Sequence, residues 1–171
     1  MERTGEVTFQ GQPLTVIGAQ LEVGAPAPDF LLLANDLSPV SLIDSDGKAR
    51  LISVVPSLDT PVCDMQTRKF NEQVSAFGDN VVGYTVSADL PFAQARWCGN
   101  AGIARMQTLS DHRDMSFGDT YGTHIKELRL EQRAVFVIGN RGIVRYAEYV
   151  PEITSHPNYD AAIAALRKCA G

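Results

Sequence analysis

Residues 50–63, R-L-I-S-V-V-P-S-L-D-T-P-V-C, lead from an apolar run through a short turn to a cysteine. The first part, residues 50–55, is a continuous run rich in β-branched side chains, which predicts a central strand buried on both faces. Pro56 ends this strand. Beyond the cysteine, apolar residues recur at i, i+4 and i+7, which predicts an amphipathic helix from about residue 61 to 77, ended by Gly78. The stretch therefore predicts a buried strand followed directly by a helix that carries the cysteine near its start.

Apolar runs bounded by Gly, Pro and polar turns predict the other elements on either side of this unit. They are a hairpin over residues 7–17, a strand that begins near residue 30, a strand over 80–87, a short helix over 90–100 opened by Pro91 and closed by Gly99, a strand over 106–110, a short helical segment over 115–122, a hairpin of strands over 134–138 and 143–150, and a helix after Pro157. This order predicts an α/β fold whose central mixed β-sheet is flanked by helices on both faces. We expect one domain over residues 1–171, with an N-terminal β-hairpin extension over residues 1–20.

The chain has 171 residues, of which 44% are hydrophobic and 20% charged, a composition typical of a soluble globular domain. The net charge of −5, without a cluster of Lys or Arg, argues against a nucleic-acid or anionic-membrane partner. The first residues lack the apolar run of a secretory signal, and the apolar stretches are too short to span a bilayer, so we expect a cytoplasmic protein without a membrane partner. The odd count of three cysteines indicates that any pairing among them is functional rather than structural.

The residues around Cys63 place its thiol at the start of the predicted helix. Thr60 falls at the N-cap, where its hydroxyl can accept a backbone N–H, and Pro61 falls at the first helical position, where its missing N–H costs nothing. Cys63 then lies in the first turn, where unpaired backbone donors and the positive end of the helix dipole favour the thiolate over the thiol. The thiolate is the nucleophilic form, and the Thr60 hydroxyl and backbone N–H groups are suitable donors for an oxygen that leaves after attack. These residues predict an activated nucleophile but leave its target open.

The same residues match a known motif. P-x-x-x-T-x-x-C, at Pro56, Thr60 and Cys63, resembles the peroxidatic motif of the peroxiredoxins. The wider S-V-V-P-S-L-D-T-P-V-C resembles the thiol peroxidase subfamily of atypical two-cysteine peroxiredoxins. The blocks G-A-P-A-P-D-F, L-P-F-A-Q-A-R-W-C, R-A-V-F-V-I and Y-V-P-E-I-T extend the resemblance along nearly the whole chain. The resemblance implies a thioredoxin-like fold and an enzyme that reduces hydrogen peroxide and organic hydroperoxides to water and alcohols.

The resemblance also implies a role for each site residue. Cys63 attacks the O–O bond of the hydroperoxide and becomes a sulfenic acid. Arg133 pairs with the thiolate and the peroxide, although the residue by itself would be interpreted as a surface charge at the start of a strand. Thr60 helps to hold the peroxide, and Pro56 shields the sulfur. Cys98 is the resolving cysteine, which closes an intramolecular disulfide with Cys63 that thioredoxin then reduces.

The position of Cys98 leaves an alternative open, because spacing alone slightly favours a buried helix cysteine beside Trp97. Two helices that flank one sheet need not bring two sulfurs into bonding range, since a disulfide tolerates Cα separations only up to about 7 Å. We therefore expect local unfolding between the two steps, either of the first turn at Cys63 or of the helix with Cys98. The resemblance and the weakly apolar segment 115–121 further suggest a homodimer.

The remaining candidate residues carry weaker signals. Cys169 is interpreted as an exposed thiol in the C-terminal tail, without a catalytic part. The three histidines, His112, His124 and His156, lack metal-ligand spacing, so we expect neither a metal nor another cofactor. Two other functions stay open: a non-catalytic redox sensor that passes a disulfide to a partner protein, and a cysteine hydrolase, for which the sequence has no local signature.

Overall fold

The stretch that begins at residue 50 forms the centre of a sheet, as predicted. In the computed structural model, which describes residues 1–170, β5 (Ala49–Val54) is buried at every position. It runs parallel to β6 (Val81–Ser87) on one side and antiparallel to β10 (Ala134–Ile138) on the other. Parallel and antiparallel pairing therefore meet at one strand, and the predicted mixed sheet is confirmed.

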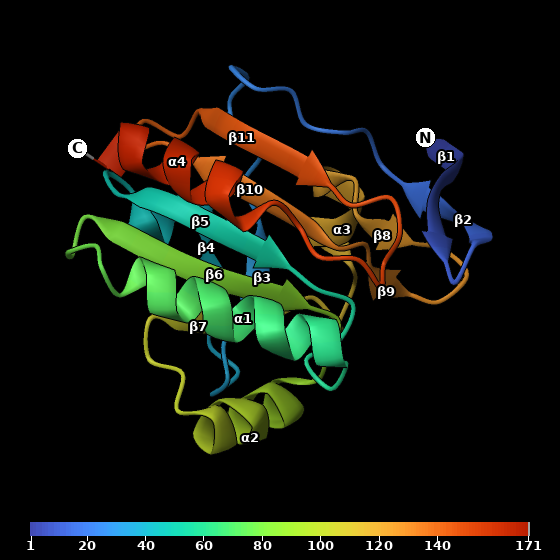
Figure 1. Cartoon of the computed structure of the whole chain (residues 1–171), viewed down its shortest axis with the longest axis horizontal. Helices are drawn as coiled ribbons and strands as arrows, with labels where there is room; N and C mark the ends of the chain where they lie inside the picture. Colours follow the sequence, from blue (N-terminus) through green and yellow to red (C-terminus); the bar gives the residue numbers. More distant parts are fainter. Residues whose placement is uncertain (171) are drawn as a thin grey trace.

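The other elements extend this sheet or pack against it. Its remaining strands are β3 (Leu31–Leu33), β4 (Pro39–Ser41), β7 (Met106–Ser110) and β11 (Val144–Tyr149). The helices are α1 (Pro61–Val74), α2 (Pro91–Ala101), α3 (Ser116–Tyr121) and α4 (Tyr159–Ala170), with a short 3-10 helix η1 (Leu42–Ser45). The seven strands lie in the order β11-β10-β5-β6-β7-β3-β4 (Figure 1).

Helices cover both faces of the sheet because β5 is apolar on both faces. On one face, Leu51 of β5 belongs to a buried cluster with Phe70 of α1 and Leu166 of α4. On the other face, Ile52 belongs to a second buried cluster with Phe117 of α3. Figure 1 shows α1 and α4 in front of the strands and α3 behind them. The predicted arrangement of a sheet between helices is confirmed.

The segment 115–121, interpreted from the sequence as part of a dimer face, turns its apolar side chains inward. Met115, Phe117 and Tyr121 are all buried within the chain. Phe117 and Tyr121 stack on each other, with ring centroids 4.2 Å apart. The apolar character of this segment therefore serves the core, and it gives no support to a contact with a second copy.

Two helix ends differ from the prediction. α1 ends at Val74 rather than at residue 77, because the amides of Ala76 and Phe77 donate to carbonyls three residues back and turn the chain. α2 continues through Gly99 and ends at Ala101, because Gly102 takes the left-handed conformation, with φ 67°, that favours glycine. A glycine is thus tolerated inside α2, and the later glycine ends it.

A second, four-stranded sheet extends the predicted N-terminal hairpin. β1 (Glu2–Phe9) and β2 (Gln12–Ile17) form the hairpin, although β1 begins well before residue 7. β8 (His124–Ile125) and β9 (Leu130–Glu131) complete the sheet in the order β1-β2-β8-β9. Each of these two strands has only two residues, which is too short for a periodic signal.

The tip of the hairpin lies against the segment that follows β11. The Ile153 amide donates to the Thr8 carbonyl at 3.0 Å, and the Thr8 amide donates to the Pro151 carbonyl at 2.7 Å. Phe9, the last residue of β1, keeps 40% of its surface exposed. The hairpin is thereby fixed beside the residues after β11.

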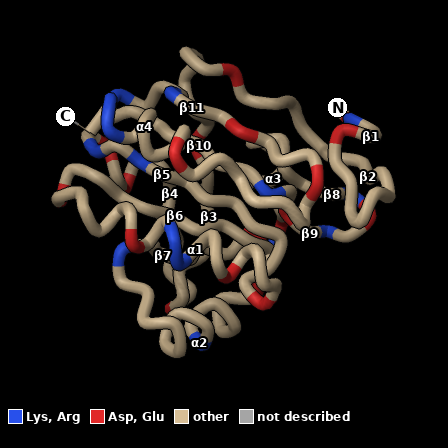
Figure 2. The backbone as a smooth tube through the Cα atoms, viewed as in Figure 1, with Lys and Arg blue, Asp and Glu red and all other residues tan. Residues whose placement is uncertain are grey.

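The surface carries both signs of charge. Figure 2 shows Lys and Arg interspersed with Asp and Glu over the elements of both sheets and the helices. Within residues 1–170, no helix combines the length and the apolar character needed to cross a bilayer.

Candidate active site

The thiol of Cys63 lies in the first turn of α1 and is fully buried. Thr60 occupies the N-cap in an extended conformation, and Pro61 is the first helical residue, as predicted. The predicted use of the Thr60 hydroxyl is wrong, however, because it accepts no helix amide and instead donates to the Ser57 carbonyl at 3.0 Å. The Thr60 amide donates to the same carbonyl at 3.2 Å, so the tight turn over 57–60 brings that oxygen within reach. The hydroxyl closes the turn, and its own oxygen stays free to accept a hydrogen bond.

Arg133 is buried beside Cys63, with 1% of its surface exposed. Its Nη2 donates to Cys63 Sγ at 3.3 Å. The guanidinium is held by two further acceptors: Ile153 O receives Nη2 at 2.6 Å and Nε at 3.1 Å, and Gln66 Oε1 receives Nη1 at 2.8 Å. The interpretation of Arg133 as a surface charge is therefore wrong, and its placement agrees with the family position.

Gln66 is a site residue that the sequence reasoning missed. Its side chain is buried on α1, one turn after Cys63, and its Nε2 donates to Ser53 Oγ at 2.7 Å. Gln66 thus links the buried strand β5 to Arg133 and fixes the direction of the guanidinium. The available signal was a polar residue on the face of α1 that the apolar period assigns to the core.

A small cavity opens beside this group, with a volume of about 100 Å³. Its lining residues come from the hairpin, the turn before α1, the start of α1, the residue before β10 and the segment after β11: Phe9, Pro56, Thr60, Pro61, Val62, Arg133, Ile153 and Thr154. The structure therefore brings Pro56, Thr60 and Arg133 to one cavity next to the buried Cys63. The lining is mostly apolar, so a ligand in the cavity meets few polar groups other than those of Thr60 and Arg133.

Cys98 lies on α2 and is half-buried, away from this cavity. Its Sγ is 3.3 Å from Thr108 Oγ1 of β7, which in turn donates to Asn35 Oδ1 at 2.8 Å. Cys63 and Cys98 are both free thiols, and each sulfur has a different polar neighbour. The structure thus describes a reduced state in which the two cysteines are not joined.

Cys169 is half-buried rather than exposed, contrary to the sequence interpretation. Its thiol donates to the Ala165 carbonyl at 3.3 Å, and burial raises its pKa. It lines a hollow of about 850 Å³, which is formed by β11, the turn before it and α4 and has no lining residue from the Cys63 site. A protonated thiol that already has a backbone acceptor is poorly suited to nucleophilic attack.

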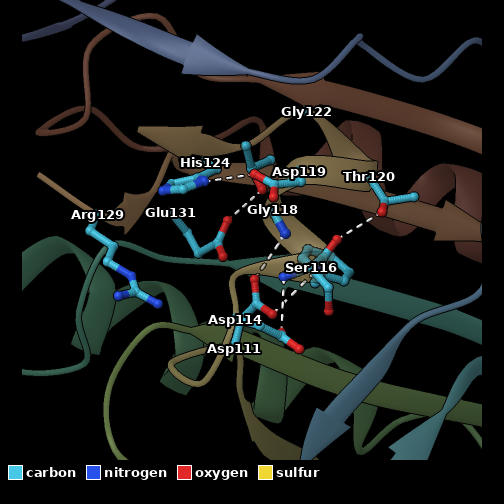
Figure 3. Close-up of polar contacts among 12 residues, drawn as sticks. Asp111, Asp114, Ser116, Gly118, Asp119, Thr120, Gly122, His124, Arg129 and Glu131 are labelled. Carbon is cyan, nitrogen blue, oxygen red and sulfur yellow. Dashed lines mark hydrogen bonds and ion pairs between the residues drawn. The ribbon is translucent and has the colours of Figure 1, made fainter. Parts of the chain in front are cut away.

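A second group of titratable side chains surrounds α3 (Figure 3). The Asp111 carboxylate accepts the amides of Phe117 and Gly118 at 3.1 Å and 2.9 Å, and the Thr123 hydroxyl donates to Glu131 at 2.5 Å. Glu131 is fully buried, and burial together with the neighbouring Asp111 carboxyl raises its pKa well above the ordinary glutamate value. The Asp111 contacts fasten α3 to the segment after β7, and the Thr123 contact fastens the segment after α3 to β9. Within residues 1–170, His, Cys, Asp and Glu form no group of three or more that could hold a metal ion.

Comparisons with known proteins agree with this geometry. A family model described as Redoxin matches residues 22–163. The thiol peroxidase of Bacillus subtilis is 58% identical over 95% of this chain and 96% of its own length, and that of Halalkalibacterium halodurans is 60% identical over 94% and 96%. The crystal structure of a peroxiredoxin-like protein from Aquifex aeolicus superposes with a TM-score of 0.89 at 38% identity, covering 98% of this chain and 97% of that one. The thioredoxin-like fold is confirmed, and the chain belongs to the Redoxin family, among its peroxiredoxin-type thiol peroxidases.

Proposed function

We propose that this enzyme reduces hydrogen peroxide and organic hydroperoxides through Cys63, with Cys98 as the resolving cysteine. The observation that carries the proposal is the contact of 3.3 Å between Arg133 Nη2 and the buried Cys63 Sγ. A guanidinium stays charged in proteins, and a buried charge-assisted hydrogen bond to sulfur stabilises the thiolate. The thiolate is the form that attacks a peroxide.

In the first step, the Cys63 thiolate attacks one oxygen of the hydroperoxide. An S–O bond forms while the O–O bond breaks, and the electron pair of the broken bond leaves with the second oxygen, which takes up a proton to become water or an alcohol. Arg133 stabilises the negative charge as it moves from the sulfur to the leaving oxygen. Thr60, whose hydrogen is donated to Ser57, offers its oxygen as an acceptor for the peroxide O–H. Pro56 walls the cavity and keeps water from the sulfur.

In the second step, the Cys98 thiolate attacks the sulfur of the Cys63 sulfenic acid. An S–S bond forms, and hydroxide leaves and is protonated to water. Because the two sulfurs face Arg133 and Thr108 in the reduced state, a local opening has to precede this bond. A dithiol protein, thioredoxin by family expectation, then exchanges with the disulfide and restores both thiols.

Intact mass after one equivalent of hydroperoxide tests both steps. The wild type should lose two hydrogens, and Cys98→Ser should gain one oxygen because its sulfenic acid is trapped. Cys169→Ser serves as the matched control and should behave as the wild type. An unchanged wild-type mass would refute the proposal.

Turnover separates the enzyme from a redox sensor with the same cysteines. With thioredoxin, thioredoxin reductase and excess hydroperoxide, the enzyme should consume peroxide in many-fold excess over protein. Consumption that stops after one equivalent would favour the sensor.

Three further features belong to the proposal. Residues 1–171 act as one domain with the N-terminal hairpin as an extension, and two copies form a homodimer, as expected from the family. The protein acts in the reducing cytoplasm, where disulfides are typically transient and catalytic, as the proposed Cys63–Cys98 bond is. Light scattering on the purified protein tests the dimer, and a monomer at micromolar concentration would contradict it.

A further inference from the structure

α2 is joined to α1 by three side chains, Asp64 and Arg68 of α1 and Trp97 of α2. Trp97 Nε1 donates to Asp64 Oδ1 at 2.9 Å, and Arg68 Nε donates to Asp64 Oδ2 at 2.8 Å. The Arg68 guanidinium also lies 5.6 Å from the centroid of the Trp97 ring, and its Nη1 donates to the Ala101 carbonyl at 3.5 Å. We call Asp64, Arg68 and Trp97 the Trp97 latch.

The latch matters because the second half of α2 has little else to hold it. Only Pro91 and Gln94 of this helix are buried, and both lie in its first half. Gln94 Nε2 fixes that half by donating to the Leu109 carbonyl at 2.9 Å. Beyond it, Cys98 has the contact with Thr108, and the latch supplies the other side-chain hydrogen bonds that residues 95–101 make within residues 1–170. A segment with so few buried contacts opens at low free-energy cost, and removal of the latch lowers that cost further.

The latch also joins the two segments that carry the cysteines. Asp64 directly follows Cys63, and Trp97 directly precedes Cys98, so the bond between Asp64 and Trp97 joins the neighbours of both thiols. The thiols themselves point to other partners, Cys63 to Arg133 and Cys98 to a hydroxyl of β7. The Trp97 ring packs against the buried cluster that contains Cys63. As long as the latch is closed, the sulfurs are therefore held in orientations that do not lead to a disulfide.

We propose that the Trp97 latch sets the rate at which Cys98 resolves the Cys63 sulfenic acid, and through it the hydroperoxide dose at which Cys63 is overoxidised. This inference rests on the proposed function. The sulfenic acid has two fates. Attack by Cys98 forms the S–S bond and releases water, whereas a second hydroperoxide transfers an oxygen to the sulfur, gives sulfinic acid and leaves as water or an alcohol. The rate of disulfide formation is independent of hydroperoxide concentration, whereas the rate of sulfinic acid formation is proportional to it. A slower opening of the latch therefore increases the fraction of Cys63 that becomes sulfinic acid.

Trp97→Phe is the most direct variant, because it keeps the apolar ring against Cys63 and removes only the indole donor and part of the stacking surface. Asp64→Asn is the milder variant, since an amide oxygen still accepts the indole N–H while the charge on Arg68 loses its partner. Arg96→Gln is the matched control: Arg96 lies on the same helix next to Trp97, is exposed, and makes no hydrogen bond to any residue that the structure describes.

Rapid-quench mass spectrometry over a series of hydroperoxide concentrations separates the two steps. Sulfenic acid formation depends on hydroperoxide concentration, and disulfide formation does not. In Trp97→Phe the concentration-independent step should accelerate about tenfold, the equivalent of about 1.4 kcal/mol. The hydroperoxide concentration that converts half of the protein to sulfinic acid should rise by a similar factor. Asp64→Asn should show a smaller change in the same direction, and Arg96→Gln should match the wild type.

The behaviour of the wild type shows whether a negative result concerns the latch or the proposed function. If the wild type forms a disulfide and Trp97→Phe does not accelerate it, or slows it, the latch inference is overturned and the proposed function stands. If the wild type forms no disulfide, the proposed function fails, and the inference fails with it. Amide exchange in the second half of α2 gives a readout that needs no peroxide: it should be faster in reduced Trp97→Phe than in the reduced wild type, and equal exchange rates would also count against the latch.

Discussion

Arg133→Lys keeps a positive charge near Cys63 but removes the planar fork of donors. The guanidinium reaches three partners through different nitrogens: Ile153 O at 2.6 Å and 3.1 Å, Gln66 Oε1 at 2.8 Å and Cys63 Sγ at 3.3 Å. The single nitrogen of lysine cannot meet acceptors in all these directions. A donor positioned in advance at a developing charge contributes about 10²–10³ in rate, or about 2.7–4 kcal/mol. We expect kcat/KM for a hydroperoxide to fall by about that factor.

The same variant should lose less in stability than in rate. Gln66 Oε1 is left without its partner, and one unsatisfied buried acceptor costs about 1–3 kcal/mol. Because domains of this size are typically stable by about 5–15 kcal/mol, the variant should still fold, with a lower urea midpoint. The loss of rate can therefore be measured on folded protein.

Stopped-flow single turnovers give the rate of Cys63 oxidation against hydroperoxide concentration, and the slope is the second-order rate constant. Arg141→Lys is the control, since Arg141 is exposed in the turn between β10 and β11 and should leave the slope unchanged. A slope for Arg133→Lys within about threefold of the wild type would refute the reasoning, because it would mean that charge alone suffices.

Three more predictions concern α3 and the turn before α1. Glu131→Gln should remove a pH dependence of stability: burial and the Asp111 carboxyl raise the Glu131 pKa, so the folded protein holds a proton that the unfolded chain releases, and the free energy of unfolding falls as the pH rises above the ordinary glutamate value. Urea midpoints at about pH 5 and about pH 8 should therefore differ more in the wild type than in the variant, and equal differences would contradict this. Gly118→Ala should lower the free energy of unfolding by about 1–3 kcal/mol, because a Cβ there would stand 2.9 Å from the Glu131 carboxylate; an unchanged urea midpoint would be inconsistent with that crowding. Thr60→Val should lower the stopped-flow oxidation rate about tenfold, since valine keeps the shape but neither bonds Ser57 nor accepts the peroxide O–H, whereas Thr60→Ser should stay near the wild type; equal rates in the two variants would exclude a role for the hydroxyl.

The fold around residue 50 was predictable because its signals are local. A run of β-branched residues identifies β5, and Thr60 with Pro61 identifies the start of α1 without any knowledge of the rest of the chain. β8 and β9 exist only through pairing with the hairpin and with each other, so a two-residue segment carries no signal of its own. The predicted end of α2 at Gly99 was wrong because a glycine can lie inside a helix or end it. Only the left-handed backbone angle of Gly102 shows which glycine ends α2.

The candidate site was predictable only in part. The position of Cys63 follows from its helix, but the burial of Arg133 depends on Gln66 and Ile153, which lie far from it along the chain. Only the family resemblance identified this arginine, and the one signal for Gln66 was a polar residue on the apolar face of α1. The Thr60 hydroxyl was assigned to the wrong partner because a capping position specifies the backbone angles, whereas the acceptor depends on the turn at Ser57.

The anchoring of Arg133 by Ile153 has a consequence for how the protein is made. Cys63 leaves the ribosome long before Arg133, and Arg133 before Ile153, so a growing chain carries its thiol without the guanidinium or the carbonyl that orients it. β5 also waits for β10 to complete the centre of its sheet. Because nascent chains emerge at about 5–20 residues per second, the cysteine spends several seconds as an ordinary thiol before the site closes around it. The group formed by Cys63, Arg133 and Ile153 is thereby completed only after synthesis has passed residue 153.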